Sequence, residues 1–475
     1  MGKKKEKIKV AFVGNNAIDV TGSQTYIEMT NYKILLECGL VQGGTVLEDY
    51  RANTKKFEFK PNKLDYVFIN HSHIDHIGNL GRLIKEGFNG RIICPKGNKQ
   101  IIYELCKDCS HIMFKDVEYL KKKFPGKQFV QAYTEKEVEM LMDYIDEYDF
   151  NEKIKLNDSI EFCFSYSQHI INSAQLELWL TQNSHTKKIL YTSDLGNVSV
   201  DNYYVKKINR IKSANLVIAE STYSDEKKKQ ITKKDREKDI EKIKSIVEQI
   251  EESKGNVLFP CFSLHRIQTM ITFMYDLFSN EDNLKCKFVL ASPLANKICN
   301  IFLDILEGEE LEKFKSVMEW DKLIRITEFE QLQRLMEDNE NYIYLASAGF
   351  LNAGYSRAIC ARLLGSSRNF IVVNGYTPEG SLAYKIKNSK QKYITIDEKV
   401  CRNLANCVAL KSMSSHMQYN DLLKYYSDIN CDQIVLVHGD MKTKIQFAKK
   451  LQDEIGKKNK TQKVVICNKN TTINL

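Results

Sequence analysis

The sequence predicts an α/β protein in which a second α/β unit is inserted into the first. A length of 475 residues exceeds what one hydrophobic core usually serves, so two domains are expected. Short strand-like runs alternate with turns up to about residue 200, and strand and helix patterns alternate again over 256–375. Candidate metal ligands occur both before and after this second stretch. The second unit, with a predicted parallel sheet, must therefore interrupt the first.

The elements follow from local patterns. Residues 97–146 are mostly helical in pattern. The charged stretch 225–252, with isoleucines at helical spacing, predicts an amphipathic helix that follows an exposed lysine-rich loop. Strands are predicted by apolar, β-rich runs at 9–14, 32–39, 64–70, 160–166, 189–193, 216–219 and 434–437.

The run His71-x-His73-x-Asp75-His76 directly follows the predicted strand 64–70. It places three imidazoles and a carboxylate within six residues of a chain that has only nine histidines. Imidazole and carboxylate ligands at this spacing suit zinc best, with manganese and iron as alternatives. The run therefore predicts a metal site where a strand ends.

Other candidate ligands also follow strand-like runs. His169 follows 160–166, Asp194 closes 189–193, and His438 closes 434–437. A single histidine of this kind is more often structural than metal-binding. The repeated placement at strand ends indicates one shared site.

The ordered set of candidate residues, together with several short motifs, resembles the metallo-β-lactamase fold nucleases of the β-CASP group, the family of the pre-mRNA 3′-end cleavage nuclease and its prokaryotic relatives. The resemblance spans nearly the whole chain. It implies a metallo-β-lactamase αββα sandwich formed by residues 1–205 and 399–475, with an inserted α/β β-CASP domain at 206–398. The motifs that carry it lie at 20–23, 71–76, 220–223, 259–266, 292–295, 375–381, 414–416 and 437–440.

The resemblance also implies the chemistry. Two zinc ions would lower the pKa of bound water for hydrolysis of RNA phosphodiester bonds to 5′-phosphate and 3′-hydroxyl ends. His416 would protonate the leaving oxygen, and Glu220 would orient His416. Asp75 completes the predicted catalytic set. The implied ligands are His71, His73 and His169 for the first ion, Asp75, His76 and His438 for the second, and Asp194 as the bridge.

Substrate contacts are predicted at Arg266, in a strand-to-helix turn, and at Ser292, before a probable helix start. A helix cap or a surface ion pair remains the alternative for either residue. Three positions depart from the family pattern: His265 and Gln168 replace residues that are usually glycine, and Ala291 replaces a common aspartate. These departures affect the expected groove shape and leave every predicted ligand in place.

Composition fits an intracellular enzyme. The net charge of +9 favours a polyanionic partner, although lysine runs such as 3–5, 121–123 and 227–229 are often simply solvated. Thirteen scattered cysteines, no secretory segment and no membrane-length apolar run predict a cytoplasmic protein without membrane contact. The Cys106-x-x-Cys109 pair has no second pair beside it and is interpreted as structural.

A ribonuclease acting on single-stranded RNA is the favoured function. The DNA-repair branch of the family typically lacks the histidine found here at 438, and silent relatives usually lack several ligands. A small-molecule hydrolase would leave the large insertion unexplained. The sequence leaves open endonuclease against 5′-exonuclease cleavage, the identity of the RNA, and whether the protein acts as a homodimer or within an RNA-processing complex.

Overall fold

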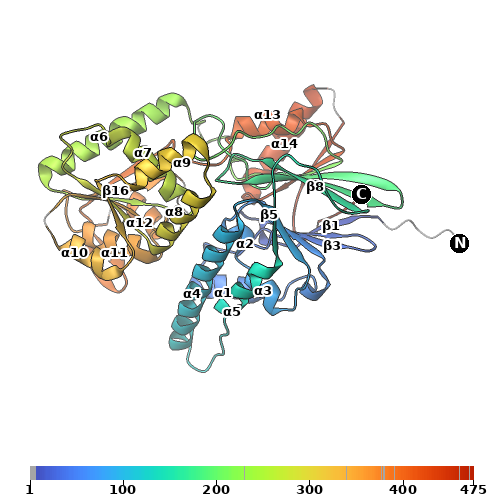
Figure 1. The fold of residues 1–475 in the computed structure, drawn as a ribbon, viewed down its shortest axis with the longest axis horizontal. Helices are drawn as coiled ribbons and strands as arrows, with labels where there is room; N and C mark the ends of the chain where they lie inside the picture. The colour runs from blue at the N-terminus through green and yellow to red at the C-terminus, as the bar shows by residue number, and fades with distance from the viewer. Residues whose placement is uncertain are drawn as a thin grey trace. The chain divides into compact units, whose positions relative to one another are not determined.

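The computed structural model divides the chain into two compact units (Figure 1). Unit 1 comprises Met1–Val198, Val205–Gln230 and Ser415–Leu475, and unit 2 comprises Ser199–Tyr204 and Ile231–Ser414. The structure describes residues 7–475 except 229, 339, 376, 378, 379, 390, 459, 460 and 470. The lysine run 3–5, Lys229, and three residues of the motif 375–381 therefore lie outside the described residues.

The first sheet of unit 1 has the order β22-β1-β2-β3-β4-β5-β6. Its first four strands in this order pair antiparallel, and β3 to β6 pair parallel. The strands are β1 (Lys9–Phe12), β2 (Thr25–Glu28), β3 (Lys33–Leu36), β4 (Tyr66–Phe68), β5 (Arg91–Pro95), β6 (Ile145–Tyr148) and β22 (Thr472–Asn474). The α-helices that accompany this sheet are α1 (Val46–Thr54), α2 (Ile74–Ile77), α3 (Leu80–Lys85), α4 (Lys99–Lys123) and α5 (Glu135–Leu141).

The second sheet of unit 1 has the order β21-β20-β11-β10-β9-β8-β7. Strands β7 to β10 pair antiparallel, whereas β10, β11, β20 and β21 pair parallel. Its elements are β7 (Ile154–Asn157), β8 (Ile160–Tyr166), β9 (Ala174–Gln182), β10 (His185–Tyr191), β11 (Leu216–Glu220), β20 (Gln433–Val437) and β21 (Lys463–Ile466), with helices α13 (Tyr419–Asp428) and α14 (Met441–Lys457).

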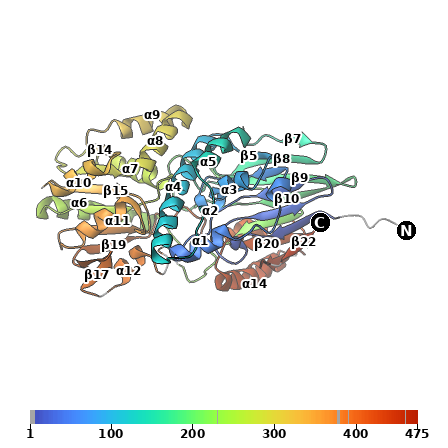
Figure 2. The same ribbon diagram turned by 90° about the horizontal axis from the view of Figure 1, so that it is seen from below.

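The two sheets pack face to face. Val10, Ile27 and Ile34 of the first sheet share a buried core with Phe162 and Leu176 of the second. A separate core joins the other face of the second sheet to α13 and α14. In Figure 1 the strands of unit 1 lie between helices α13 and α14 on one side and helices α1 to α5 on the other. Figure 2, seen from below, shows helices α1 to α5 in front of the strands. The predicted αββα sandwich is confirmed.

Unit 2 is built on a parallel sheet with the order β14-β13-β15-β12-β16-β19, with helices on both faces (Figure 1). The predicted α/β architecture of the insertion is confirmed. Its strands are β12 (Val257–Pro260), β13 (Lys287–Ala291), β14 (Leu323–Ile326), β15 (Tyr342–Ala346), β16 (Phe370–Asn374) and β19 (Asn406–Leu410), with the separate pair β17 (Tyr393–Ile396) and β18 (Lys399–Arg402). Its helices are α6 (Lys233–Ser253), α7 (Arg266–Phe278), α8 (Pro293–Ile305), α9 (Gly308–Met318), α10 (Phe329–Glu337), α11 (Gly354–Leu363) and α12 (Leu382–Asn388).

Several element boundaries differ from the sequence prediction for local reasons. The helix predicted within 225–252 begins at Lys233, because the Thr232 side chain and Asp235 form a capping box there. The stretch 97–146 divides into α4 and α5, and Pro125 and Gly126 lie in the connection. β11 pairs with β10 and β20 in unit 1, and the compact units change at 230/231 and 414/415. The division of the sequence at 205/206 and 398/399 stays a prediction.

The fold positions the site through the ends of strands in unit 1. Strands β4, β8, β10 and β20 each end shortly before a predicted ligand.

Within the described part of the chain, no helix is both long enough and apolar enough to cross a bilayer.

Candidate metal centre

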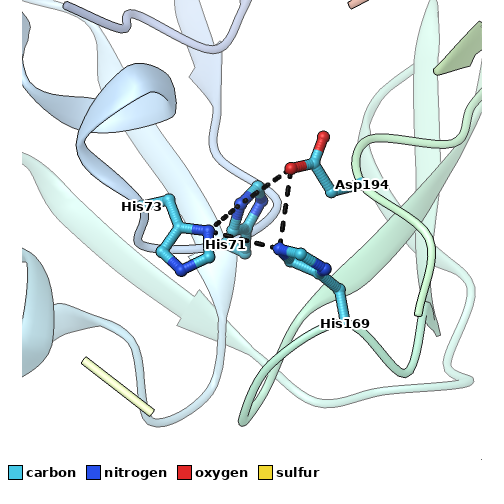
Figure 3. Close-up of side chains that lie close together, drawn as sticks. All are labelled: His71, His73, His169 and Asp194. Carbon is cyan, nitrogen blue, oxygen red and sulfur yellow. Dashed lines mark hydrogen bonds and ion pairs between the residues drawn. The ribbon is translucent and has the colours of Figure 1, made fainter. Parts of the chain in front are cut away.

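Three histidine rings converge beside one carboxylate in unit 1 (Figure 3). His71 and His73 follow β4, His169 follows β8, and Asp194 follows β10. Nε2 of His71 and Nε2 of His169 each lie 3.2 Å from Nδ1 of His73. Oδ2 of Asp194 lies 3.7 Å from His71 Nε2 and 3.6 Å from His169 Nε2. These four residues form the first ligand cluster.

A second cluster is formed by Asp75, His76 and His438. Asp75 and His76 lie on the short helix α2, and His438 follows β20. Oδ2 of Asp75 lies 3.3 Å from Nε2 of His438 and 3.6 Å from Nε2 of His76. His438 and His76 are buried, while about a fifth of the Asp75 side chain is exposed.

Asp194 lies between the two clusters. Its Oδ2 faces the first cluster, and its Oδ1 lies 3.5 Å from Nε2 of His76 and 3.5 Å from Nδ1 of His438. One carboxylate thus offers an oxygen to each side. The sequence predicted this shared position for Asp194, and the structure brings all seven predicted ligands together here.

The donor atoms fit metal ions. Ligands held at about 2.1 Å around a tetrahedral zinc ion lie roughly 3.4 Å apart, close to the separations of 3.2 to 3.7 Å found in the first cluster. Nε2 of His76 and Oδ1 of Asp194 lie 3.5 Å apart, and both atoms are buried yet make no hydrogen bond to the described part of the protein. Leaving such atoms without partners is costly, and a cation between them would satisfy them.

Protonation states also favour a cation. Burial lowers the pKa of His73 to about 4 and lowers the pKa values of His71 and His169 well below the usual range. These rings are therefore neutral at pH 7 and offer lone pairs. Burial opposes charge on His76 too, but Asp194 and Asp75 raise its pKa well above the usual value. The carboxylates of Asp194 and Asp75 thus draw positive charge into the site.

Three family models match separate stretches of this chain. The metallo-beta-lactamase superfamily matches residues 18–105, the Beta-Casp domain matches 267–386, and the Zn-dependent metallo-hydrolase RNA specificity domain matches 405–462. The chain is a β-CASP member of the metallo-β-lactamase superfamily. A Zn-dependent family description and two His/Asp clusters together support a metal cofactor.

Relatives of this β-CASP protein include named RNA-processing proteins. A ribonuclease of Thermus thermophilus is 24% identical over 442 residues, covering 92% of this chain and 94% of the relative. Cleavage and polyadenylation specificity factor 73 of Drosophila melanogaster is 24% identical over 441 residues, covering 92% of this chain but only 60% of the relative. A crystal structure of a protein of unknown function from Enterococcus faecalis aligns with a TM-score of 0.54 over 99% of this chain and 100% of that chain, at 14% identity, which shows the fold alone.

The predicted catalytic pair of this β-CASP protein also lies at the site. Glu220 ends β11 and is buried, with its two carboxylate oxygens accepting from the backbone N–H groups of Leu195 and Thr222 at 3.2 and 2.8 Å. Nδ1 of His416 lies 3.8 Å from Oε1 of Glu220, within ion-pair range but beyond a hydrogen bond. The His416 ring lies 4.5 Å from that of the ligand His169 and keeps about a fifth of its side-chain surface exposed. It is therefore accessible beside the first cluster.

Sequence reasoning missed residues that hold the ligand rings. Glu37, at the end of β3, places Oε1 3.5 Å from Nδ1 of His76 and accepts from Ser193 Oγ at 3.2 Å. Ser193 Oγ in turn lies 3.2 Å from Nδ1 of His71. Glu37 directly follows β3 in the structure, but it lies inside the strand-like run 32–39 of the sequence, which hid it. Ser193 and Thr222 gave no signal either, because serine and threonine are common throughout the sequence.

Thr222 supports the second cluster in the same way. Its Oγ1 lies 2.9 Å from Nδ1 of His438, and its N–H donates to Glu220. Thr222, two positions after Glu220, thus links the predicted catalytic carboxylate to the ring of a predicted ligand. Such outer contacts fix ring orientation and tautomer in metal sites.

The predicted substrate residues lie in unit 2. Ser292 is the N-cap of α8, where its Oγ accepts from Ala295 N–H at 3.1 Å and from Ser347 Oγ at 2.8 Å. The structure thus shows the capping role that the sequence had left open, and phosphate contact by Ser292 stays a prediction. Arg266 is the first residue of α7, as expected from its strand-to-helix turn.

The family departures at 168 and 265 occupy unusual backbone positions. Gln168 has φ 66° and His265 has φ 64°, in the region where glycine is preferred. The Gln168 side chain makes a hydrogen bond, in which its Oε1 accepts from Ile208 N–H at 3.0 Å. The glycine expected at each position therefore has a physical reason, and this chain carries strain instead.

The Cys106 and Cys109 pair lies on α4 with both thiols buried. Burial raises the pKa of Cys106 to about 12 and raises the pKa of Cys109 well above its usual range. Neutral buried thiols are poor metal ligands, which supports the structural interpretation.

Proposed function

We propose that this protein is a two-zinc ribonuclease that hydrolyses phosphodiester bonds of single-stranded RNA to 5′-phosphate and 3′-hydroxyl ends. The single observation that carries the proposal is the placement of Asp194 between two clusters, each of which has its own imidazoles. The names of the relatives and the RNA specificity domain at 405–462 support RNA as the substrate.

The side chains divide the work. When bound, two zinc ions supply a nucleophile from water near neutral pH and neutralise charge that develops on the phosphate. His71, His73 and His169 would hold one ion, Asp75, His76 and His438 the other, and Asp194 both.

Glu220 and His416 would act on the leaving group. Backbone N–H groups of Leu195 and Thr222 fix the carboxylate, which faces Nδ1 of His416. The carboxylate on that side would fix the orientation of the ring. The partly exposed ring would then give its proton to the departing 3′ oxygen.

The complete ligand set favours an active enzyme over a silent subunit of a processing complex. The alternative function, a DNA nuclease, is tested by comparing the rates at which the protein cleaves RNA and DNA. Association as a homodimer or within an RNA-processing complex, and residence in the cytoplasm, belong to the same proposal.

The test uses end-labelled single-stranded RNA and DNA of the same sequence, with and without chelator. We expect faster cutting of RNA, loss of activity in chelator, recovery with zinc, and 5′-phosphate ends. Mapping the first products distinguishes internal cutting from removal of nucleotides at the 5′ end. Asp75→Ala protein serves as the control for contaminating nuclease. DNA cleavage as fast as RNA cleavage, absent from that variant, would favour the DNA-repair branch instead.

A further inference from the structure

A small hollow in unit 2 is lined largely by hydrogen-bond donors. Arg236 contributes to it from the first turn of α6, Arg266 and Thr269 from the first turn of α7, and Asn202 from the segment Ser199–Tyr204. Its volume is about 20 Å³. This suffices for one water-sized group, such as a single oxygen of a larger anion.

Arg236 lacks an anionic partner. Its guanidinium stacks over the ring of Phe273 at 4.1 Å, and its printed hydrogen bond is to the weak acceptor Sδ of Met413. In the part of the chain that the structure describes, no carboxylate lies within ion-pair distance of it. A guanidinium offers five N–H donors, so most of its capacity is unused.

Two carboxylates near the hollow, Asp239 and Asp276, already have partners. Asp239 accepts from the backbone N–H groups of Lys411 and Ser412, both at 2.7 Å, and from Ser412 Oγ at 2.8 Å. Asp276 accepts from the Tyr203 hydroxyl at 2.6 Å and pairs with Lys313. Neither carboxylate forms an ion pair with Arg236.

Two further features favour an anion. Nδ2 of Asn202 is buried and makes no hydrogen bond to the described residues. Arg266 opens α7, whose N-terminus carries partial positive charge. Burial, together with the charge of Arg266, lowers the pKa of the Arg236 guanidinium. The guanidinium groups of Arg236 and Arg266 and the unbonded Nδ2 of Asn202 thus line one small space.

We propose that Asn202, Arg236 and Arg266 bind one phosphate group in unit 2. Planar guanidinium groups match the oxygens of a phosphate, and the anion would offset the cost of burying charge beside Arg266. That the phosphate belongs to an RNA backbone rests on the proposed function. The binding of phosphate itself does not.

The first arm of the test uses inorganic phosphate and the full-length chain. Arg236→Met keeps the packing on Phe273 but removes the charge, and Arg334→Met, on the exposed face of α10, is the control with the same charge change. Both are made in an Asp75→Ala background, so that the metal centre contributes little. At tenfold excess over Kd, phosphate should raise Tm of the background protein and the Arg334→Met control by roughly 3–6 °C and leave Arg236→Met unshifted.

The second arm measures binding of a single-stranded oligoribonucleotide to the same three proteins. Arg236→Met should weaken binding about tenfold and reduce the slope of log K against log salt by about 0.7, the value for one lost phosphate contact on a single strand. The Arg334→Met control should change neither quantity.

The outcomes separate the possible roles. A purely structural arginine would lower Tm in phosphate-free buffer when replaced, with no change in the phosphate shift or the salt slope, and that result overturns the proposal. A phosphate shift that needs Arg236, with unchanged RNA binding, assigns the site to a free phosphate or a small phosphorylated ligand and overturns the RNA assignment. Binding of both ligands through Arg236, together with a natural protein that cuts no RNA in the presence of zinc, leaves this site in place and refutes the proposed function.

Discussion

The Glu37 carboxylate lies 3.5 Å from Nδ1 of His76, and both side chains are completely buried. The other ring nitrogen of His76 faces Asp75 and Asp194. A carboxylate that accepts the proton at Nδ1 leaves the lone pair at Nε2 for a metal. Through Ser193, the same carboxylate also reaches His71. Glu37 therefore orients one ligand of each proposed ion.

Glu37→Gln should weaken zinc binding by about 10- to 100-fold, because it keeps the volume of the side chain and removes the charge that orients His76. Competition with a chromophoric chelator measures the affinity. Glu28→Gln, on the partly exposed part of β2, is the control and should bind zinc as the natural protein does. Unchanged affinity in Glu37→Gln would show that burial alone orients the ring.

Asp194→Asn should reduce the zinc content from about two ions per chain to well below one, because the carboxylate faces both clusters and screens the repulsion between two cations. His73→Ala belongs to the first cluster only and should lose about one ion. Elemental analysis of protein purified without chelator gives both values. A full ion retained by Asp194→Asn would mean that the carboxylate is not shared.

The residues of the two clusters could be predicted because each is close to a strand end. Strands β10, β11 and β20 run parallel, so their carboxyl ends lie at one edge, and Asp194, Glu220 and His438 meet there. Glu37 follows the same rule, but its flanking residues Leu36 and Cys38 made it part of an apolar run. Its role depends on a distance to His76 that no local pattern encodes.

Arg236 shows the same limit in unit 2. It lies in a helix of alternating charges, where one arginine resembles any other in sequence. Only packing reveals that its partners are an aromatic ring and a thioether rather than a carboxylate. Similarly, the family pattern marked His265 as a departure, but only its backbone angles give the reason.

His265→Gly should be more stable than His265→Ala by about 1 kcal/mol, the reverse of the usual order. His265 has φ 64° and ψ −45°, and Arg266 N–H donates to Leu264 O at 2.7 Å, which closes a strained γ-turn. Both variants lose the ring, so the comparison isolates the backbone. Urea unfolding measures the difference.

The matched control for that comparison is Lys244, an exposed position inside α6. There the alanine variant should be the more stable by about 1 kcal/mol, because glycine lowers helix stability. If His265→Ala is instead more stable than His265→Gly, the strained γ-turn is not kept in these variants.

Lys444 should make stability depend on pH in the alkaline range. Its Nζ donates to Ala17 O at 2.9 Å in a fully buried position, and burial lowers its pKa from 10.5 to about 8. Between these values the unfolded chain binds more protons than the native protein, so this residue makes stability rise with pH from about 8 to 10.5, by at most roughly 3 kcal/mol.

The measurement for Lys444 is the difference in unfolding free energy between the natural protein and Lys444→Met at several pH values. Groups common to both proteins cancel in this difference. We expect it to be constant below pH 7 and to shift in favour of the natural protein above pH 8. A difference that does not vary with pH would mean that the buried amine stays charged throughout.

His416→Ala should keep its zinc and lose on the order of 10² to 10⁴ in cleavage rate, the usual contribution of a general acid. The His416 ring lies beside the first cluster, but the ligand atoms found there come from His71, His73, His169 and Asp194. An RNA substrate with a leaving group that needs no protonation should restore much of the lost rate, because only the proton transfer is missing. Loss of one zinc ion in His416→Ala would make His416 a ligand, and equal defects on both substrates would assign it to binding or positioning of the phosphate.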